Sequence, residues 1–176
     1  MGVLTDFFAA TPDELAAMAM EWGPVPPAPG AVKARKGFFG FRSRQPSPAP
    51  TEPPGPTLEA VQSKGILNVQ LGVLDELVTR TPYEVLESTG VIDAIARDNG
   101  EEGPWVFPVR RELRDALATL DDGLASDLAR QWGSSEELDA TEPEDFEALE
   151  ELIRDLAALA RSAGSSERDL YLWTSL

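Results

Sequence analysis

Three short apolar segments in this chain of 176 residues have the composition of β-strands. They lie near 3–9, 104–109 and 169–175 and are rich in aromatic and β-branched residues. Between them, apolar residues recur at intervals of three and four, which is typical of amphipathic helices. Because an isolated strand cannot satisfy its own backbone hydrogen bonds, we expect the strands to share one sheet. The pattern predicts an α+β fold, mostly helical, with a small sheet of about three strands covered by helices.

Helix starts are marked by a recurring Thr-x-x-Glu pattern. In such a capping box, the Thr hydroxyl and the Glu carboxylate bond free amide groups around the first helical turn. The pattern occurs in "TPDE" from Thr11, "TPYE" from Thr81 and "TEPE" from Thr141. Together with the apolar stripes, it predicts helices at about 12–22, 67–79, 82–90, 110–120, 123–132 and 143–163, the last ended by Gly164.

A proline-rich stretch separates the first strand and helix from the rest of the chain. Ten of the 15 prolines lie between Gly23 and Pro56, and proline neither continues a helix nor donates to a strand ladder. We therefore expect 23–57 to be a flexible insertion, while 1–22 and 58–176 form one compact domain. The first strand and helix are too short to fold alone, so they should pack against the body.

A basic-aromatic loop lies within this insertion, although the formal net charge of the chain is −16. Five charges give modest, salt-sensitive affinity for nucleic acid or an anionic membrane, and the acidic body opposes both, so we expect neither as a partner. We expect the loop to dock on its own domain as a tethered lid; a mobile loop or a hook for a partner is the alternative. Its basic and aromatic residues are Lys33, Arg35, Lys36, Phe38, Phe39, Phe41, Arg42 and Arg44.

The acidic band, residues 136–155, holds ten acidic residues and one basic residue, Arg154. Some of these acids favour a helix start through the helix dipole, but ten exceed what capping requires. A surface for a basic protein is the functional interpretation, and a solvated helix face is the structural one. Core or rim packing is the default for the four tryptophans, and Trp132 is the candidate for an exposed interface anchor. The candidate interaction residues are Trp132, Glu136, Glu137, Asp139, Glu144, Asp145, Glu147 and Glu151.

The composition excludes several kinds of chemistry. Since the chain has no histidine and no cysteine, it lacks His-based catalysis and metal ligation, thiolate nucleophiles and disulfides. It also has no phosphate-binding loop of the GxxxxGK[ST] type and no GxGxxG pattern. Carboxylates remain, but adjacent pairs such as Asp75-Glu76 diverge by about 100° on a helix and are expected on a solvated face. We predict no cofactor, no metal and no catalytic residue.

The chain begins with "MGVLTDFF" and "TPDELAAMA" and closes with "LIRDLAALARSAGSSERDLYLWTSL". These two ends resemble small uncharacterised bacterial proteins of the YfbM-like domain-of-unknown-function family, whose members also begin with Met-Gly and an aromatic strand before a helix. The usage of Ala, Arg, Asp and Pro is similar to that of high-GC actinobacterial proteins. Neither resemblance implies a function.

The sequence contains no basic-then-apolar leader, and no apolar run reaches the ~18 residues that span a bilayer. We therefore expect a soluble, cytoplasmic protein, with no prediction for its oligomeric state. The leading hypothesis is a small non-enzymatic interaction protein, similar to immunity proteins, that binds a basic protein partner. The alternatives are a carboxylate-dependent enzyme that uses a divalent metal ion, and a subunit of a larger assembly.

Overall fold

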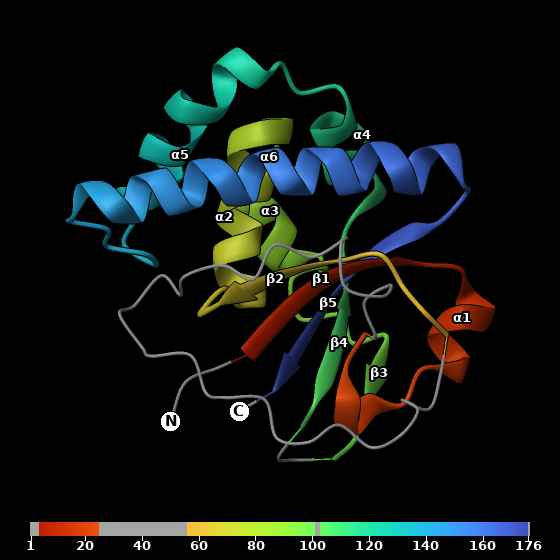
Figure 1. Ribbon diagram of the computed structural model, residues 1–176. Coiled ribbons are helices and arrows are strands. Elements are labelled where there is room, and N and C mark those ends of the chain that lie inside the picture. Colours follow the sequence, from red (N-terminus) through yellow and green to blue (C-terminus); the bar gives the residue numbers. More distant parts are fainter. Residues whose placement is uncertain (1–3, 25–55, 101–102, 176) are drawn as a thin grey trace.

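A five-stranded antiparallel sheet lies at the centre of the molecule (Figure 1). The computed structural model describes residues 4–24, 56–100 and 103–175. The strands are β1 (Leu4–Ala10), β2 (Ala60–Lys64), β3 (Arg97–Asp98), β4 (Trp105–Pro108) and β5 (Asp169–Ser175). Their order in the sheet is β2-β1-β5-β4-β3. The first and last strands therefore lie side by side in the middle, and β1 packs against the body as expected.

The helices follow the predicted order along the described chain. Two short 3₁₀ helices, η1 and η2, accompany the α-helices. The bounds are α1 (Pro12–Ala17), η1 (Met20–Trp22), α2 (Asn68–Thr79), α3 (Tyr83–Ser88), α4 (Arg111–Ala118), η2 (Asp122–Leu124), α5 (Ala125–Gly133) and α6 (Pro143–Ser165).

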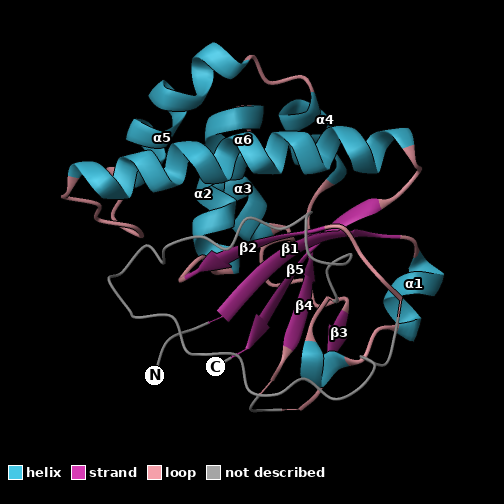
Figure 2. Ribbon diagram, in the orientation of Figure 1, coloured by secondary structure: helices cyan, strands magenta, loops and turns pink. Residues whose placement is uncertain are grey.

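The two faces of the sheet are covered by different layers (Figure 2). On one face, Phe7 and Leu172 pack with side chains of α2, α4, α5 and α6 in the main core. On the other face, Phe8 and Trp173 pack with side chains of α1 and η1 in a smaller core. Successive side chains of a strand point to opposite faces of the sheet. Because both faces are covered, the consecutive residues Phe7 to Ala10 of β1 are all buried, which explains their uninterrupted apolar sequence.

The α+β class is confirmed, but the prediction of about three strands is wrong in number. The three predicted segments form β1, β4 and β5, whereas β2 and β3 were missed. The sequence of β2, AVQSK, has little β propensity; it becomes a strand because it pairs with β1 from Leu4↔Lys64 to Phe8↔Ala60. The two residues of β3, opposite β4, are too few to show an alternating pattern.

Two helix ends differ from the prediction. The first helix stops at Ala17 rather than near residue 22, because Met18 has an extended backbone (φ −66°, ψ 134°). The last helix continues through Gly164 and ends at Ser165. A glycine near a helix end is therefore not by itself a stop signal, because Gly164 lies within the helix and its φ is not positive.

Of the three predicted capping boxes, the first is confirmed, the second does not form at the start of α3, and the third is shifted by one residue. The Thr11 hydroxyl accepts from the Glu14 amide at 3.2 Å, and the Glu14 carboxylate accepts from the Thr11 amide at 2.8 Å. The N-cap of α3 is Pro82 rather than Thr81. In α6, Pro143 occupies the first helical position, so the preceding Glu142 is the N-cap and Asp145 completes the box.

Candidate functional site

The acidic band lies at the N-terminal end of α6, where α5 packs beside this helix (Figure 1). It begins in the loop between the two helices. The amide of Ala140 donates to the carbonyl of Gly133 at 2.8 Å, which closes the loop on the end of α5. The side-chain amide of Gln70 donates to the carbonyl of Glu137 at 3.0 Å, which ties the loop to α2. The backbone of the band is thus held by two neighbouring helices.

Five carboxylates of the band project from this frame into solvent. All five are exposed, and no ion pair or side-chain hydrogen bond joins them to a residue in the described part of the chain. They are Glu136, Glu137, Asp139, Glu144 and Glu147. Five of the eight predicted interaction residues are therefore exposed carboxylates at one end of α6. None of the five forms an ion pair or a side-chain hydrogen bond with another described residue.

Other acids of the band take part in the fold. Asp145 is half-buried, and its carboxylate accepts from the Glu142 amide at 3.3 Å. Glu150 forms an ion pair with Arg154 one turn later on α6. Glu151, another predicted interaction residue, is exposed on the same helix. Capping and pairing thus account for part of the band, as the structural interpretation expects.

The charge of the acidic band affects Tyr83, the first residue of α3. Burial raises the pKa of its phenol above the usual value, and the charges of Glu87, Glu137 and Asp93 raise the pKa further. Each of these three carboxylates disfavours an additional negative charge on the phenolate.

A cleft of about 490 Å³ opens beside the band, between α5 and the start of α6. Its lining combines hydroxyl groups, two apolar side chains, two carboxylates and one guanidinium. The lining residues are Ser126, Arg130, Ser134, Thr141, Pro143, Phe146, Glu147 and Glu150. Only Glu147 among them was predicted as an interaction residue; Phe146 fits the apolar stripe of the helix, so the sequence pattern places it in the core.

The prediction that Trp132 is an exposed anchor is wrong. Its side chain is fully buried in the main core, and its indole N–H donates to the Gln70 carbonyl at 2.8 Å. The neighbouring Gly133 is buried as well. Trp132 therefore joins α5 to α2 inside the molecule, as the default expectation of core packing has it.

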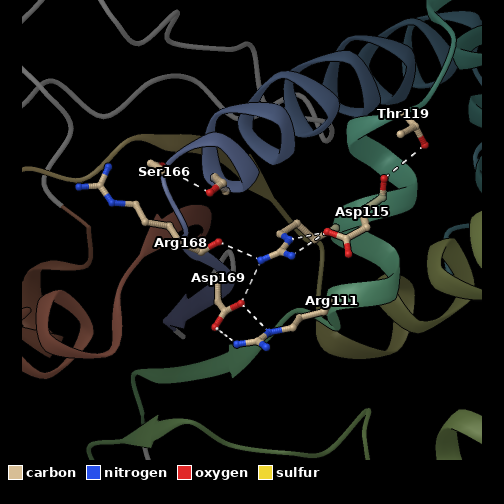
Figure 3. A network of polar contacts seen from close by, with 8 residues as sticks. Arg111, Asp115, Thr119, Ser166, Arg168 and Asp169 are labelled. Atoms are coloured by element: carbon tan, nitrogen blue, oxygen red, sulfur yellow. Dashed lines mark hydrogen bonds and ion pairs between the residues drawn. The ribbon is translucent and has the colours of Figure 1, made fainter.

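The opposite end of α6 has a different arrangement of charge (Figure 3). Asp169, the first residue of β5, accepts from Nε of Arg111 at 3.0 Å and from Nη1 of Arg114 at 3.1 Å. Arg114 also bonds the Asp115 carboxylate at 2.8 and 2.7 Å and the carbonyl of Arg168 at 3.0 Å. These contacts fasten α4 to the turn between α6 and β5.

The same network continues to α1 through Arg168. Its guanidinium donates twice to Glu14, at 3.0 and 2.5 Å, and this interaction is the main reason that the pKa of Glu14 is lowered. Glu14 also serves in the capping box of α1. Hence Glu14, Asp115 and Asp169 are bonded by arginines from two parts of the chain, α4 and the turn before β5.

A buried ion pair lies between α2 and α4. Asp75, 5% exposed, lies 3.3 Å from Nε of Arg110 and accepts from the Thr79 hydroxyl at 3.0 Å. Burial raises the pKa of Asp75 more than the Thr79 hydroxyl and the Arg110 guanidinium lower it. The expectation that the Asp75-Glu76 pair lies on a solvated face is therefore wrong for Asp75. The cleft beside it, about 30 Å³, has room for roughly one water molecule.

Asp6 is a further carboxyl that lies half-buried in the sheet. It lies on β1 between Gln62 of β2 and Trp173 of β5, on the sheet face covered by α1 and η1. Burial raises the pKa of Asp6 to about 7. No charged residue on the described strands lies directly opposite it, so its ionised form has no compensating pair there.

Among residues 4–24, 56–100 and 103–175, no group of three or more acidic side chains is arranged to hold a metal ion. In the same residues, no helix is both long and apolar enough to cross a membrane. The basic-aromatic loop, from Lys33 to Arg44, lies outside the described residues, as does almost all of the predicted insertion 23–57.

Comparison of the chain with known proteins found no matching family model, no matching curated protein and no matching solved structure. The resemblance to YfbM-like proteins therefore stays a prediction. Function must be argued from the residues themselves.

Proposed function

We propose that this chain is a non-enzymatic interaction protein whose acidic band binds a basic protein partner, as immunity proteins bind theirs. The observation that carries the proposal is the set of five exposed carboxylates, Glu136, Glu137, Asp139, Glu144 and Glu147, without a paired cation among the described residues. Carboxylates gathered in this way repel one another, and a cationic partner relieves that repulsion.

The rigid frame under the band supports the same proposal. The loop is bonded to α5 and α2, and Glu144 and Glu147 project from the first turns of α6. Little conformational entropy is then lost by the backbone when a partner binds, which favours a surface of this kind over a flexible acidic tail.

The test is affinity capture with the full-length protein from a native lysate of its source organism, at about 50 mM and about 500 mM NaCl. We expect a partner of basic isoelectric point that is retained at low salt and released at high salt, because the Debye length falls several-fold over this range. Recovery of no basic partner at low salt, or only of partners indifferent to salt, would contradict the proposal.

A further inference from the structure

The cleft between α5 and α6 gives the acidic band a defined receptor for one chemical group. We propose that this cleft receives an arginine side chain of the basic partner. The inference rests on the proposed function and specifies which group of the partner the band recognises. The volume of about 490 Å³ is within the ~300–1,000 Å³ typical of ligand sites, so a guanidinium and its aliphatic stem fit with neighbouring atoms of the partner chain.

The apolar part of the lining suits the stem and the flat face of such a side chain. Phe146 is half-buried, and Pro143 lies one turn before it on α6. A Cβ at Gly133 would lie 2.8 Å from Cε1 of Phe146, so the absence of a side chain at Gly133 lets the ring lie close against α5. A guanidinium stacks on an aromatic ring, while its methylene groups pack on apolar surface.

The charges of the lining leave one carboxylate available. Glu150 is paired with Arg154. Arg130, the one cation among the described lining residues, donates to the Ser126 hydroxyl at 2.9 Å and lies 3.6 Å from the Asp127 carboxylate. Glu147 has no such pair among the described residues, so the unmatched charge of the cleft is negative.

The remaining lining groups favour arginine over lysine. The hydroxyl oxygens of Ser134 and Thr141 accept hydrogen bonds, and they line the same cleft as Glu147. A guanidinium presents five donors in a plane and can meet several acceptors while it stacks on a ring, whereas an ammonium is a compact, strongly hydrated charge.

The probe is a capped pentapeptide, acetyl-Gly-Gly-Arg-Gly-Gly-amide, titrated into the ¹⁵N-labelled full-length protein at low ionic strength. Two matched peptides replace arginine by lysine or by citrulline, which has the same shape as arginine without the charge. We expect amide shifts confined to the α5 end and the start of α6, with the arginine peptide binding at least about threefold more tightly than the lysine peptide. The citrulline peptide should cause no saturable shift.

Two variants address the walls of the cleft, and a third is the matched control. Glu147→Gln and Phe146→Leu should each weaken binding of the arginine peptide about fivefold, and Phe146→Leu should reduce the preference for arginine over lysine. Glu144→Gln removes the same charge from the same helix outside the cleft and should weaken binding less than about twofold. Unchanged circular dichroism and Tm establish that each variant is folded.

Equal weakening by Glu147→Gln and Glu144→Gln would overturn the inference, because it indicates diffuse attraction to the band. The same conclusion follows if no saturable shifts occur at the cleft, or if arginine and lysine peptides bind equally and Phe146→Leu has no effect. None of these results removes the proposed function, which is tested separately by salt-dependent capture of a basic partner.

Discussion

The two ends of α6 both carry acidic side chains, but their surroundings differ. At the C-terminal end, Glu14, Asp115 and Asp169 each bond an arginine. At the N-terminal end, the five exposed carboxylates of the acidic band have no ion pair within the described residues. The placement of arginine distinguishes carboxylates that hold the fold from carboxylates that face solvent without an ion pair among the described residues.

The buried pair of Asp75 and Arg110 is the extreme case of a structural carboxylate, and its disruption should have the largest effect. Arg110→Met leaves Asp75, which is 5% exposed, without its cation. We expect the free energy of unfolding to fall by about 3 kcal/mol, measured by urea denaturation at neutral pH. The double variant Asp75→Leu/Arg110→Met should recover part of this loss, because neither charge is then buried alone. A neutral effect of Arg110→Met would show that the pair does not stabilise the fold.

The network of ion pairs at the C-terminal end of α6 can be disrupted by changing one residue. Asp169→Ala removes the acceptor shared by Arg111 and Arg114 and should destabilise the protein by about 2 kcal/mol in the same assay. The matched change at the other end, Glu136→Ala, should stay within about 0.5 kcal/mol. Similar losses for both variants would contradict the distinction between the two ends.

Asp6 tests a half-buried carboxyl that has no charged residue directly opposite it on the described strands. Its pKa is about 7 in the folded state, above the ordinary value of about 3.9 in an unfolded chain. The folded state therefore binds the proton more tightly, and this contribution to stability is complete below about pH 4 and is lost as pH rises to about 7.

The variant Asp6→Asn should lack this contribution to the pH dependence. At pH 8 its Tm should exceed that of the wild type by about 3 °C, because the wild type must then hold a partly desolvated charge. Thermal unfolding followed by circular dichroism between pH 4 and pH 8 measures the pH dependence of Tm and the Tm difference at pH 8. As a control, Asp13→Asn changes an exposed carboxyl and should keep the wild-type pH profile. Parallel profiles for wild type and Asp6→Asn would contradict the assignment.

The smallest expected effect concerns repulsion within the acidic band. For the wild type, an increase from about 20 to about 500 mM NaCl should raise Tm by about 1–3 °C, since salt screens like charges. The triple variant Glu136→Gln/Glu137→Gln/Glu147→Gln should show a smaller rise. A Tm that falls with salt in the wild type would mean that paired charges dominate the electrostatic energy.

The sequence predicts the parts of this fold that depend on local pattern. Continuous apolar strands such as β1 and β5, and the stripe of α6, are visible because neighbouring residues in the chain report on the same buried face. The strand β2 could not be predicted, since its polar sequence forms a strand only through pairing with β1, more than 50 residues away. The position of the band was predictable from charge alone.

The side-chain environment of the candidate site was not predictable to the same degree. Trp132 and Glu136 are four residues apart, yet one is fully buried and the other exposed. Trp132 lies in a core formed with residues of α2, α4 and α6, and its indole N–H donates to Gln70, a residue distant in sequence. Asp75 likewise depends on Arg110, and no local spacing indicates that these two residues meet.

The central claim is tested most directly by the affinity of the captured basic partner for two matched variants of this protein. One variant neutralises four acids of the band, Glu136→Gln, Glu137→Gln, Glu144→Gln and Glu147→Gln. The other neutralises four exposed acids elsewhere, Asp13→Asn, Glu21→Gln, Asp98→Asn and Glu167→Gln, so the net charge of the two is equal. We predict at least about a tenfold rise in Kd for the first and less than about threefold for the second, by calorimetry at about 50 mM NaCl. Equal changes in Kd would contradict the claim that the N-terminal end of α6 is the binding surface.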